Sequence, residues 1–238
     1  MTYELLNTSD SNHSKWLARQ EAIIASLRCQ PFLLVVRPLL DDPLSSQRLL
    51  DQLKLLHDAG LRNVEVAWSS HAGWKSFVRE IQGCCPRFHL GVASVVGREA
   101  FQDLQLLDLS YAMAPCWDPS LVSDARDLGQ LIIPGVLSPT EVQQAAAFGC
   151  RLVKLFPAVT VGVAYWKRLE APLGPLPFVV AAGGLTTSDL SDWLGAGHDA
   201  VALGRRAIGD HVFRDHAFGD QCVDPALLGW LTRSPSSA

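Results

Sequence analysis

The sequence predicts a (β/α)8 TIM barrel preceded by one additional helix. Eight short apolar runs recur along the chain, and segments with helical periodicity lie between them. Several runs are rich in Val, Ile and Leu without strict alternation, as expected of parallel strands that are buried on both faces. Eight units favour a closed barrel over an open doubly wound sheet, and no Gly-x-Gly-x-x-Gly follows the first run, which argues against dinucleotide binding. The predicted strands are Phe32–Arg37, Val64–Trp68, His89–Val95, Ser110–Pro115, Leu131–Pro134, Leu152–Phe156, Phe178–Ala182 and Ala200–Gly204.

Helices are predicted where apolar residues or start signals recur at helical spacing. Ser14–Arg28, ahead of the first strand, is amphipathic, and we expect it to plug the bottom of the barrel. Ser45–Ala59 repeats Leu at helical spacing and ends before a glycine. The Ser-Pro-Thr-Glu sequence at 138–141 is an N-terminal capping signal, so we predict a helix over Thr140–Phe148. Thr186–Leu194 follows the same plan.

The regular pattern ends towards the C-terminus. We expect a barrel over about 31–216, an irregular tail over Gly219–Ala238, and fraying over Ser234–Ala238. Because no linker-like change of composition interrupts the chain, we expect one domain over residues 1–238.

Composition limits the classes of partner. Of the 238 residues, 48% are hydrophobic, which supports a globular core, and the net charge is −4. With no stripe of Lys and Arg, we expect no nucleic-acid partner. The apolar run at 31–36 is far shorter than the roughly 20 residues of a membrane span, and Met1–Asn12 lacks the basic and apolar regions of a signal peptide. These two observations lead us to expect a protein that does not bind membranes. Six cysteines without a Cys-x-x-Cys pair indicate reduced thiols, so we also expect a cytoplasmic protein.

Two charged residues lie inside predicted strands, where apolar side chains are expected. Lys154 and Glu65 are each flanked by apolar residues on both sides. A desolvated lysine has a lowered pKa and can attack a ketone to form a Schiff base, and a buried carboxyl beside it can move protons. The alternatives are a lysine at a strand end with its amine in solvent, and a structural salt bridge between Glu65 and Lys154 or Arg37. The residues alone leave both alternatives open.

Candidate anion contacts follow the predicted strands. Arg37 ends the first strand, where its planar guanidinium could bind a substrate anion, although a surface arginine is the simpler interpretation. Gly183 and Gly184 follow the seventh strand and Gly204 follows the eighth, in the loops that commonly bind phosphate in barrels. Glycine lets the backbone approach an anion closely, but a Gly-Gly pair alone is usually only a turn.

Other catalytic motifs are missing from the sequence. The histidines show no metal-site spacing with carboxylates or cysteines, so we expect neither a metal nor a cofactor. His89 and His198 begin predicted strands, at the end opposite the expected site, and we interpret them as structural. No Gly-x-Ser-x-Gly is present, which argues against a hydrolase with a serine nucleophile.

Several short segments resemble one known family, the 2-keto-3-deoxy-6-phosphogluconate (KDPG) aldolases and their 4-hydroxy-2-oxoglutarate aldolase relatives. The resemblance covers about residues 20–210, and the order and spacing of the segments make it specific. The matching segments are Gly60–Val66, Gly91–Val95, Leu131–Val136, Val153–Ala158 and Ala182–Leu185.

The resemblance implies a class I aldolase on a (β/α)8 barrel, usually a homotrimer. Such an enzyme acts without a cofactor on a phosphorylated 2-keto sugar acid and on pyruvate, as in the Entner-Doudoroff pathway. Lys154 would form the Schiff base with the ketone, and Glu65 would transfer protons. The substrate contacts that the resemblance implies are Arg37, Ser94, Pro115, Phe156, Gly183, Gly184, Gly204, Arg205 and Arg206.

The chain departs from the family pattern at several of these positions. Ser69 stands where the family usually has an arginine, and loss of a charged hydrogen bond to a carboxylate weakens binding by about 1.5–3 kcal/mol. Ser94 replaces a threonine but keeps the hydroxyl, whereas Ala182 replaces a threonine linked to stereochemical choice. The family's Ser-Pro-Gly reads Ala-Pro-Cys at 114–116, and Arg206 replaces a serine. The Schiff-base chemistry is therefore better supported than the identity of the substrate.

We expect a lyase that cleaves KDPG to pyruvate and glyceraldehyde 3-phosphate. Two alternatives stay open. One is a phosphate-binding barrel of the isomerase or synthase type, similar to thiamine-phosphate synthase, in which Lys154 only contacts an anion. The other is a non-catalytic sugar-acid binding protein, suggested by Ser69 and Ala182.

Overall fold

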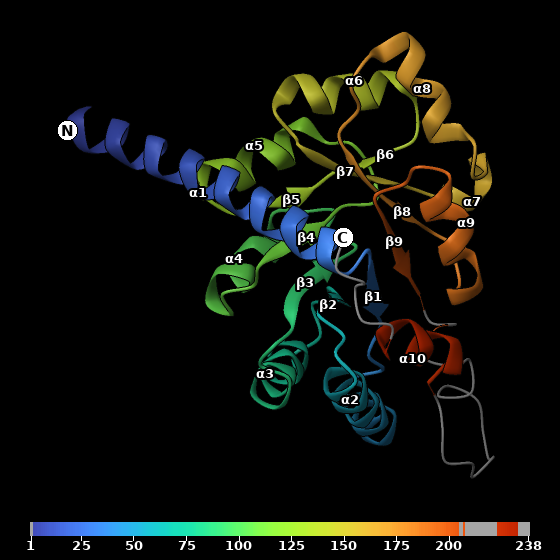
Figure 1. Cartoon of the computed structure of the whole chain (residues 1–238). Coiled ribbons are helices and arrows are strands. Elements are labelled where there is room, and N and C mark those ends of the chain that lie inside the picture. The colour runs from blue at the N-terminus through green and yellow to red at the C-terminus, as the bar shows by residue number, and fades with distance from the viewer. Residues whose placement is uncertain (1, 205–206, 208–222, 233–238) are drawn as a thin grey trace.

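Parallel strands form a barrel that is surrounded by helices (Figure 1). The computed structural model describes residues 2–204, 207 and 223–232, with side chains from residue 10 onward. All neighbouring strand pairs are parallel, and the strands are almost entirely buried because helices cover their outer faces. The (β/α)8 barrel is thus confirmed.

Each predicted strand overlaps an observed strand, and the second observed strand begins one residue before the predicted Val64. In chain order the strands are β1 (Phe32–Val36), β2 (Asn63–Ala67), β3 (His89–Ala93), β4 (Tyr111–Met113), β5 (Ile132–Ile133), β6 (Gly135–Val136), β7 (Leu152–Leu155), β8 (Phe178–Ala182) and β9 (Ala200–Leu203).

The barrel closes around Pro134. The strand order is β5-β4-β3-β2-β1-β9-β8-β7-β6, so the two ends of the order, β5 and β6, follow each other in the chain. Pro134 lies between them and has no backbone N–H to give to a neighbouring strand. Its carbonyl oxygen accepts a hydrogen bond of 2.9 Å from the backbone N–H of Lys154. The prediction of a strand that ends at Pro134 therefore missed β6.

The helices between the strands pack their apolar faces on the barrel. The signals at both ends of α6 act as the sequence indicates: Ser138 and Glu141 form a capping box at its start, and Gly149 ends it with a positive φ of 98°. The predicted helix over Thr186–Leu194 is instead a 3-10 turn followed by a short helix. These elements are α2 (Pro43–Asp58), α3 (Trp74–Cys84), α4 (Glu99–Leu106), α5 (Pro119–Asp127), α6 (Pro139–Phe148), α7 (Ala158–Val161), α8 (Tyr165–Leu173), η1 (Thr187–Asp189) and α9 (Leu190–Gly195).

Helix α1 (Thr2–Cys29) lies across the end of the barrel at which the strands begin (Figure 1). The guanidinium of Arg19 donates to the carbonyl of Ser110, just before β4, and to the carbonyl of Gly129, just before β5. The side chain of Gln20 accepts a hydrogen bond of 2.7 Å from the N–H of Arg151, just before β7. These contacts confirm the plug helix.

Helix α1 is longer than the sequence predicts. It begins at Thr2 rather than at Ser14. Among its described side chains, the first buried one is Trp16, and residues 10–15 before it are exposed or half-buried. Residues 10–15 have no buried face and therefore need no apolar periodicity, which is the signal on which the prediction depended.

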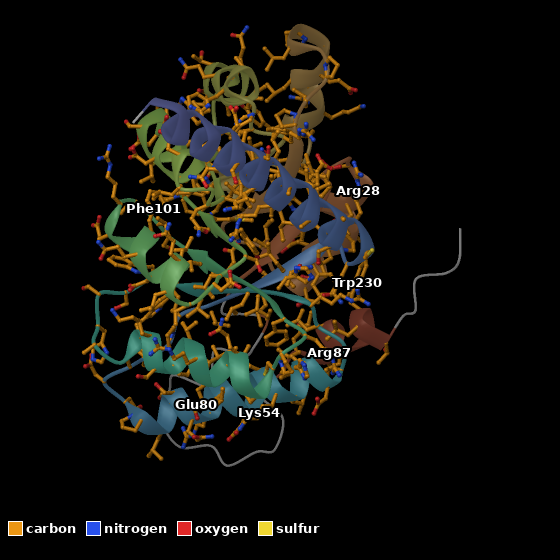
Figure 2. All side chains as sticks on the ribbon, turned by 90° about the vertical axis from the view of Figure 1, so that its left-hand side faces the viewer. Arg28, Lys54, Glu80, Arg87, Phe101 and Trp230 are labelled. Carbon is orange, nitrogen blue, oxygen red and sulfur yellow. The ribbon has the colours of Figure 1, made fainter. Side chains whose placement is uncertain are left out.

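The C-terminal segment contains one further helix. In α10 (Pro225–Thr232), Leu227 is fully buried. Trp230 of this helix, labelled in Figure 2, packs edge-to-face with Phe32 at 6.4 Å between ring centroids. The prediction of an irregular tail is wrong for these residues, because a helix of this length shows too little periodicity to be recognised. Ser234–Ala238 lie outside the described residues.

None of the helices within the described ranges has both the length and the apolar character that a membrane span requires.

Candidate active site

Lys154 and Glu65 both lie in the interior of the barrel. Lys154 is in β7 and Glu65 is in β2, and only 8% and 1% of their respective surfaces are exposed. Most of the Lys154 side chain is thus buried, which argues against the alternative of a lysine at a strand end with its amine in solvent. Each charge acts on the other, yet the described residues contain no ion pair between them, and Oε1 of Glu65 has no hydrogen-bond partner. The structural salt bridge is not formed either.

The surroundings of Glu65 bring its carboxyl close to neutrality. Burial raises the pKa of Glu65 from 4.5 to about 7, against the charge of Lys154, the Tyr111 hydroxyl and the charge of Arg37, which all lower it. A carboxyl that titrates near neutral pH can both accept and donate a proton.

The surroundings of Lys154 favour the free amine. Burial lowers the pKa of Lys154, the negative charge of Glu65 opposes this change, and the positive charge of Arg37 adds to it. The Nζ atom lies 4.5 Å from the centre of the Phe156 ring and makes no hydrogen bond to any described residue. An unprotonated amine that is largely buried and makes no hydrogen bond to a described residue is a nucleophile for a ketone.

Arg37 and Ser94 form a polar pair at the ends of their strands. Arg37 follows β1, Ser94 follows β3, and Nη2 of Arg37 donates a hydrogen bond of 3.1 Å to Oγ of Ser94. Ser94 has a positive φ of 64°, which is uncommon for a residue other than glycine and recurs at functional sites. The exposed guanidinium and the serine hydroxyl can bind a carboxylate together.

The Gly183-Gly184 turn packs on the segment that follows Lys154. Both glycines have positive φ, 98° and 84°. A Cβ atom on Gly183 would lie 3.0 Å from the Phe156 ring, and one on Gly184 would lie 2.7 Å from Val159. No larger residue fits this turn without a shift of its neighbours.

Two further predicted contacts, Gly204 and Pro115, lie at the same end of the barrel. Gly204 follows β9, and its carbonyl accepts a hydrogen bond of 3.0 Å from the N–H of Ala207. Pro115 follows β4 and packs so tightly on Gly135 that a Cβ atom there would lie 2.3 Å from its carbonyl carbon. Arg205 and Arg206 lie outside the described residues.

Tyr111 is a polar group of this interior that sequence reasoning missed. It is the first residue of β4 and is fully buried. Burial and the charge of Glu65 raise its pKa well above the ordinary value, so its hydroxyl stays protonated. A tyrosine in an apolar strand is normally read as packing, and nothing local in the sequence links it to a residue two strands away.

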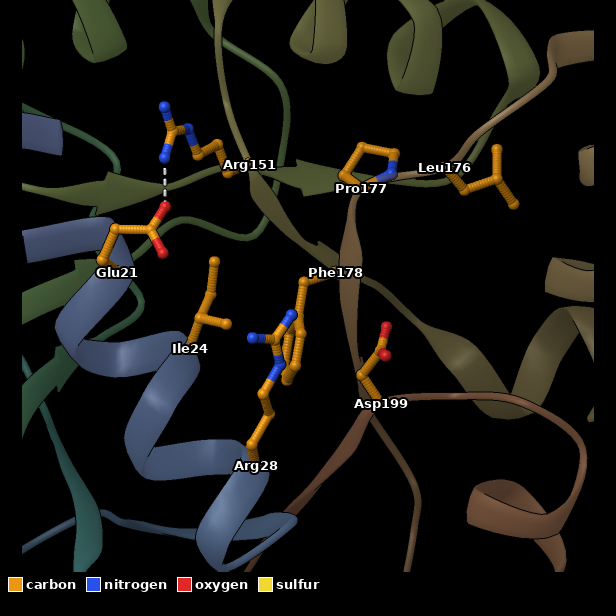
Figure 3. A pocket seen from close by; sticks show the side chains of 8 residues that line it. All are labelled: Glu21, Ile24, Arg28, Arg151, Leu176, Pro177, Phe178 and Asp199. Carbon is orange, nitrogen blue, oxygen red and sulfur yellow. Dashed lines mark hydrogen bonds and ion pairs between the residues drawn. The ribbon is translucent and has the colours of Figure 1, made fainter.

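A pocket at the opposite end of the barrel has no comparable chemistry. It lies between α1 and the beginnings of β7, β8 and β9 (Figure 3). Arg28, Arg151, Glu21 and Asp199 line it, and Arg151 forms an ion pair with Glu21. The opposite charges balance, and catalytic groups in barrels stand at the other end, where the strands terminate. Within the described ranges no group of three or more side chains could hold a metal ion.

Comparison with known proteins identifies the family. The pattern of the aldolase family described as KDPG and KHG aldolase matches residues 30–217, which is more than half of the chain. The chain belongs to the KDPG and KHG aldolase family. A 2-dehydro-3-deoxy-phosphogluconate aldolase of Treponema pallidum is 29% identical over 142 residues, which cover 59% of this chain and 67% of the relative. A 2-dehydro-3-deoxy-6-phosphogalactonate aldolase of Escherichia coli is 27% identical over 147 residues, which cover 62% of this chain and 72% of the relative.

The barrel of this aldolase family member is also the barrel of solved KDPG aldolases. The Legionella pneumophila enzyme, with pyruvate captured as a covalent carbinolamine intermediate, superimposes with a TM-score of 0.70 over 89% of this chain and 97% of its own. At 17% identity the likeness concerns the fold.

The departures from the aldolase family's pattern have definite places in the structure. Ser69 follows β2, and its hydroxyl accepts a hydrogen bond of 3.1 Å from the N–H of His71. Ala182 ends β8 and is buried, and Cys116 is exposed. No charge replaces the family's arginine at position 69, whereas Arg37 is close enough to influence both Lys154 and Glu65.

Proposed function

We propose that this KDPG and KHG aldolase family member cleaves KDPG to pyruvate and glyceraldehyde 3-phosphate through a Schiff base on Lys154. One observation carries the proposal: a buried lysine with a lowered pKa shares the barrel interior with a carboxyl whose pKa is about 7. Membership of the family supports a carbon-carbon lyase, and relatives with two different substrates leave the sugar acid to experiment.

The chemistry follows from these two groups. The free amine of Lys154 attacks the C2 carbonyl of the 2-keto acid to give a carbinolamine, and protonation of its hydroxyl by Glu65 expels water and leaves an iminium ion. The Glu65 carboxylate then removes the proton of the C4 hydroxyl. The C3–C4 bond breaks, its electron pair enters the iminium system to give an enamine, and the aldehyde departs. Protonation at C3 and addition of water release pyruvate and the free lysine.

The other residues position the substrate in this proposal. Arg37 and Ser94 bind the carboxylate, and Phe156 packs against the Schiff base while Pro115 borders it. The backbone N–H groups of the turn at 183–184 and of the turn after Gly204 bind the phosphate, and Arg205 and Arg206 add positive charge there.

Reductive trapping tests the mechanism. Incubation with pyruvate and sodium borohydride should convert the Schiff base into a stable secondary amine, and mass mapping of peptides should place the adduct on Lys154. Lys154→Arg keeps the positive charge without a free amine and should lose both the adduct and all turnover. Lys167→Arg, on the exposed surface of α8, is the matched control and should keep both. A folded wild-type protein without the adduct would contradict the mechanism.

The substrate is tested by a lactate dehydrogenase-coupled assay for pyruvate. We expect release from KDPG, and comparison with its C4 epimer and with 4-hydroxy-2-oxoglutarate reports the effect of Ala182 on stereochemical choice. Stabilisation by phosphate esters that survives Lys154→Arg, without pyruvate release, would instead favour an isomerase or synthase. Stabilisation by sugar acids without any turnover would favour a binding protein.

The proposal extends to the assembly and its compartment. We infer a cytoplasmic homotrimer that acts in the Entner-Doudoroff pathway, because the resemblance implies a trimer and the cysteines have no disulfide-forming pattern. Light scattering of the purified protein should give three times the mass of one chain, and a monomer would contradict the inference.

A further inference from the structure

Two polar atoms at the centre of the barrel are buried without partners. They are Oε1 of Glu65 and the hydroxyl oxygen of Tyr111. Glu65 is 1% exposed and Tyr111 is 0% exposed. Buried polar groups in proteins are nearly always hydrogen-bonded, because an unpaired one is strongly unfavourable. Two such groups in the same interior suggest that they serve each other or a bound molecule.

The register of three strands aligns the two residues. Glu65 in β2 is opposite Gly91 in β3, and Gly91 is opposite Tyr111 in β4. The three residues therefore occupy one level of the barrel on neighbouring strands, and their side-chain positions face the same way.

Gly91 leaves the space through which Tyr111 reaches towards Glu65. A Cβ atom on Gly91 would lie 2.4 Å from Cζ of Tyr111, the ring carbon that carries the hydroxyl. The tyrosine ring therefore lies directly over the glycine of the intervening strand, with its hydroxyl end on the side of β2. Any side chain at position 91 would occupy this path.

The charges of the two groups are complementary in this arrangement. The Tyr111 hydroxyl lowers the pKa of Glu65, which burial alone would raise further, and the charge of Glu65 helps to keep the phenol protonated. Tyr111 is thus a hydrogen-bond donor throughout the pH range in which Glu65 titrates. The hydroxyl and carboxyl are not within hydrogen-bond geometry in the structure. Hydrogen bonds of catalytic groups are often loose until substrate binds.

We propose that Tyr111 is a positioning residue for Glu65, and that its hydroxyl donates a hydrogen bond to the carboxylate whenever Glu65 is charged, in the free enzyme as well as during the reaction. This inference rests on the proposed function, in which the Glu65 carboxylate removes the proton of the substrate's C4 hydroxyl. The hydrogen bond holds one carboxylate oxygen, so that the other faces the space between Glu65 and Lys154. It also increases the share of Glu65 that is available as a base near neutral pH.

The variant Tyr111→Phe tests the role, because it removes only the hydroxyl and keeps the ring over Gly91. The acidic limb of the pH profile of kcat/KM reports the ionisation of the free enzyme's base. We expect this limb to move to higher pH by about one unit in Tyr111→Phe, while the pyruvate adduct on Lys154 still forms. Tyr165→Phe is the matched control: its hydroxyl donates to the carbonyl of Leu137, and its loss should leave the limb in place.

A second measurement needs no turnover. The infrared carbonyl band of the protonated Glu65 carboxyl, assigned by its loss in Glu65→Gln, can be titrated in the free protein. Its midpoint should lie at higher pH in Tyr111→Phe than in the wild type. An unchanged midpoint together with an unchanged limb would overturn the inference. If wild-type protein forms no adduct with pyruvate, the proposed function fails, and the midpoint alone then decides whether Tyr111 acts on Glu65.

Discussion

Glu65 makes the stability of the barrel depend on pH. Its pKa is 4.5 in an unstructured chain and about 7 in the folded protein, where burial raises it. Between these values the folded state binds more protons than the unfolded state, so the free energy of unfolding falls as pH rises. The contribution of the buried, protonated carboxyl is complete below about pH 4.5 and is lost as pH rises through about 7. At 1.36 kcal/mol for each pKa unit, the loss is about 3 kcal/mol at most.

The substitution Glu65→Gln removes this titration. Urea unfolding at pH 5 and pH 8 should show a smaller loss of stability in Glu65→Gln than in the wild type, because the amide stays neutral at both values. Glu80→Gln, at an exposed position on α3, is the control and should keep the wild-type dependence. Equal pH dependence in Glu65→Gln and the wild type would mean that the buried carboxyl does not titrate in this range.

At the scale of single residues, the sequence predicted which charged side chains are unusual but not which side chains contact each other. Lys154 and Glu65 stood out because each interrupts an apolar run, and that local contrast needs no structure. The hydrogen bond between Arg37 and Ser94 joins residues that are far apart in sequence and meet only because β1 and β3 end at the same edge. Tyr111 was missed for a related reason, since its hydroxyl acquires meaning only beside Gly91 and Glu65.

Among the elements, β6, which follows β5 and Pro134 in the chain, begins with the described glycine that has the least room for a side chain. Gly135 opens β6, where its N–H donates to the carbonyl of Cys116 and its backbone pairs with Lys154. A Cβ atom at this position would lie 2.3 Å from the carbonyl carbon of Pro115, a contact that backbone movement alone can relieve. The closure of the barrel and the placement of Lys154 therefore depend on the same glycine.

We predict that Gly135→Ala destabilises the protein by about 1–3 kcal/mol, as overpacking in a dense core does, and reduces trapping of pyruvate on Lys154. Gly195→Ala, at the end of α9, is the control, because a Cβ atom there meets nothing within 4 Å. Chemical denaturation measures the first effect, and the yield of the borohydride adduct measures the second. Wild-type stability in Gly135→Ala would show that the contact with Pro115 relaxes freely.

Element boundaries were predictable where a local signal exists. The capping box of Ser138 and Glu141 and the left-handed Gly149 set both ends of α6 as the sequence indicates. No such signal marks β6, which is two residues long and follows a proline. None marks α10 either, because this helix is short and is recognised only by the packing of Leu227 into the core. Tertiary contacts define these two elements, and local patterns in the sequence do not reveal such contacts.

Across the whole molecule, the end of the barrel where the strands terminate differs in role from the end where they begin. The candidate catalytic groups stand inside the barrel or where strands end, whereas α1 covers the end where strands begin. Arg19 joins the two parts: its guanidinium donates hydrogen bonds of 3.0–3.1 Å to the carbonyls of Leu109, Ser110 and Gly129. In barrels, residues at this end serve stability rather than chemistry.

This separation predicts different effects of Arg19→Met on stability and on chemistry. Loss of the guanidinium leaves three carbonyls ahead of β4 and β5 without their charged donor, which should lower the free energy of unfolding by about 1.5–3 kcal/mol. Well below the unfolding temperature, however, the variant should still form the pyruvate adduct in wild-type yield, because the surroundings of Lys154 do not change. Lys15→Met, one helical turn earlier and exposed, should leave both quantities unchanged. A folded Arg19→Met protein that traps no pyruvate would mean that the plug helix also sets the geometry of the catalytic interior.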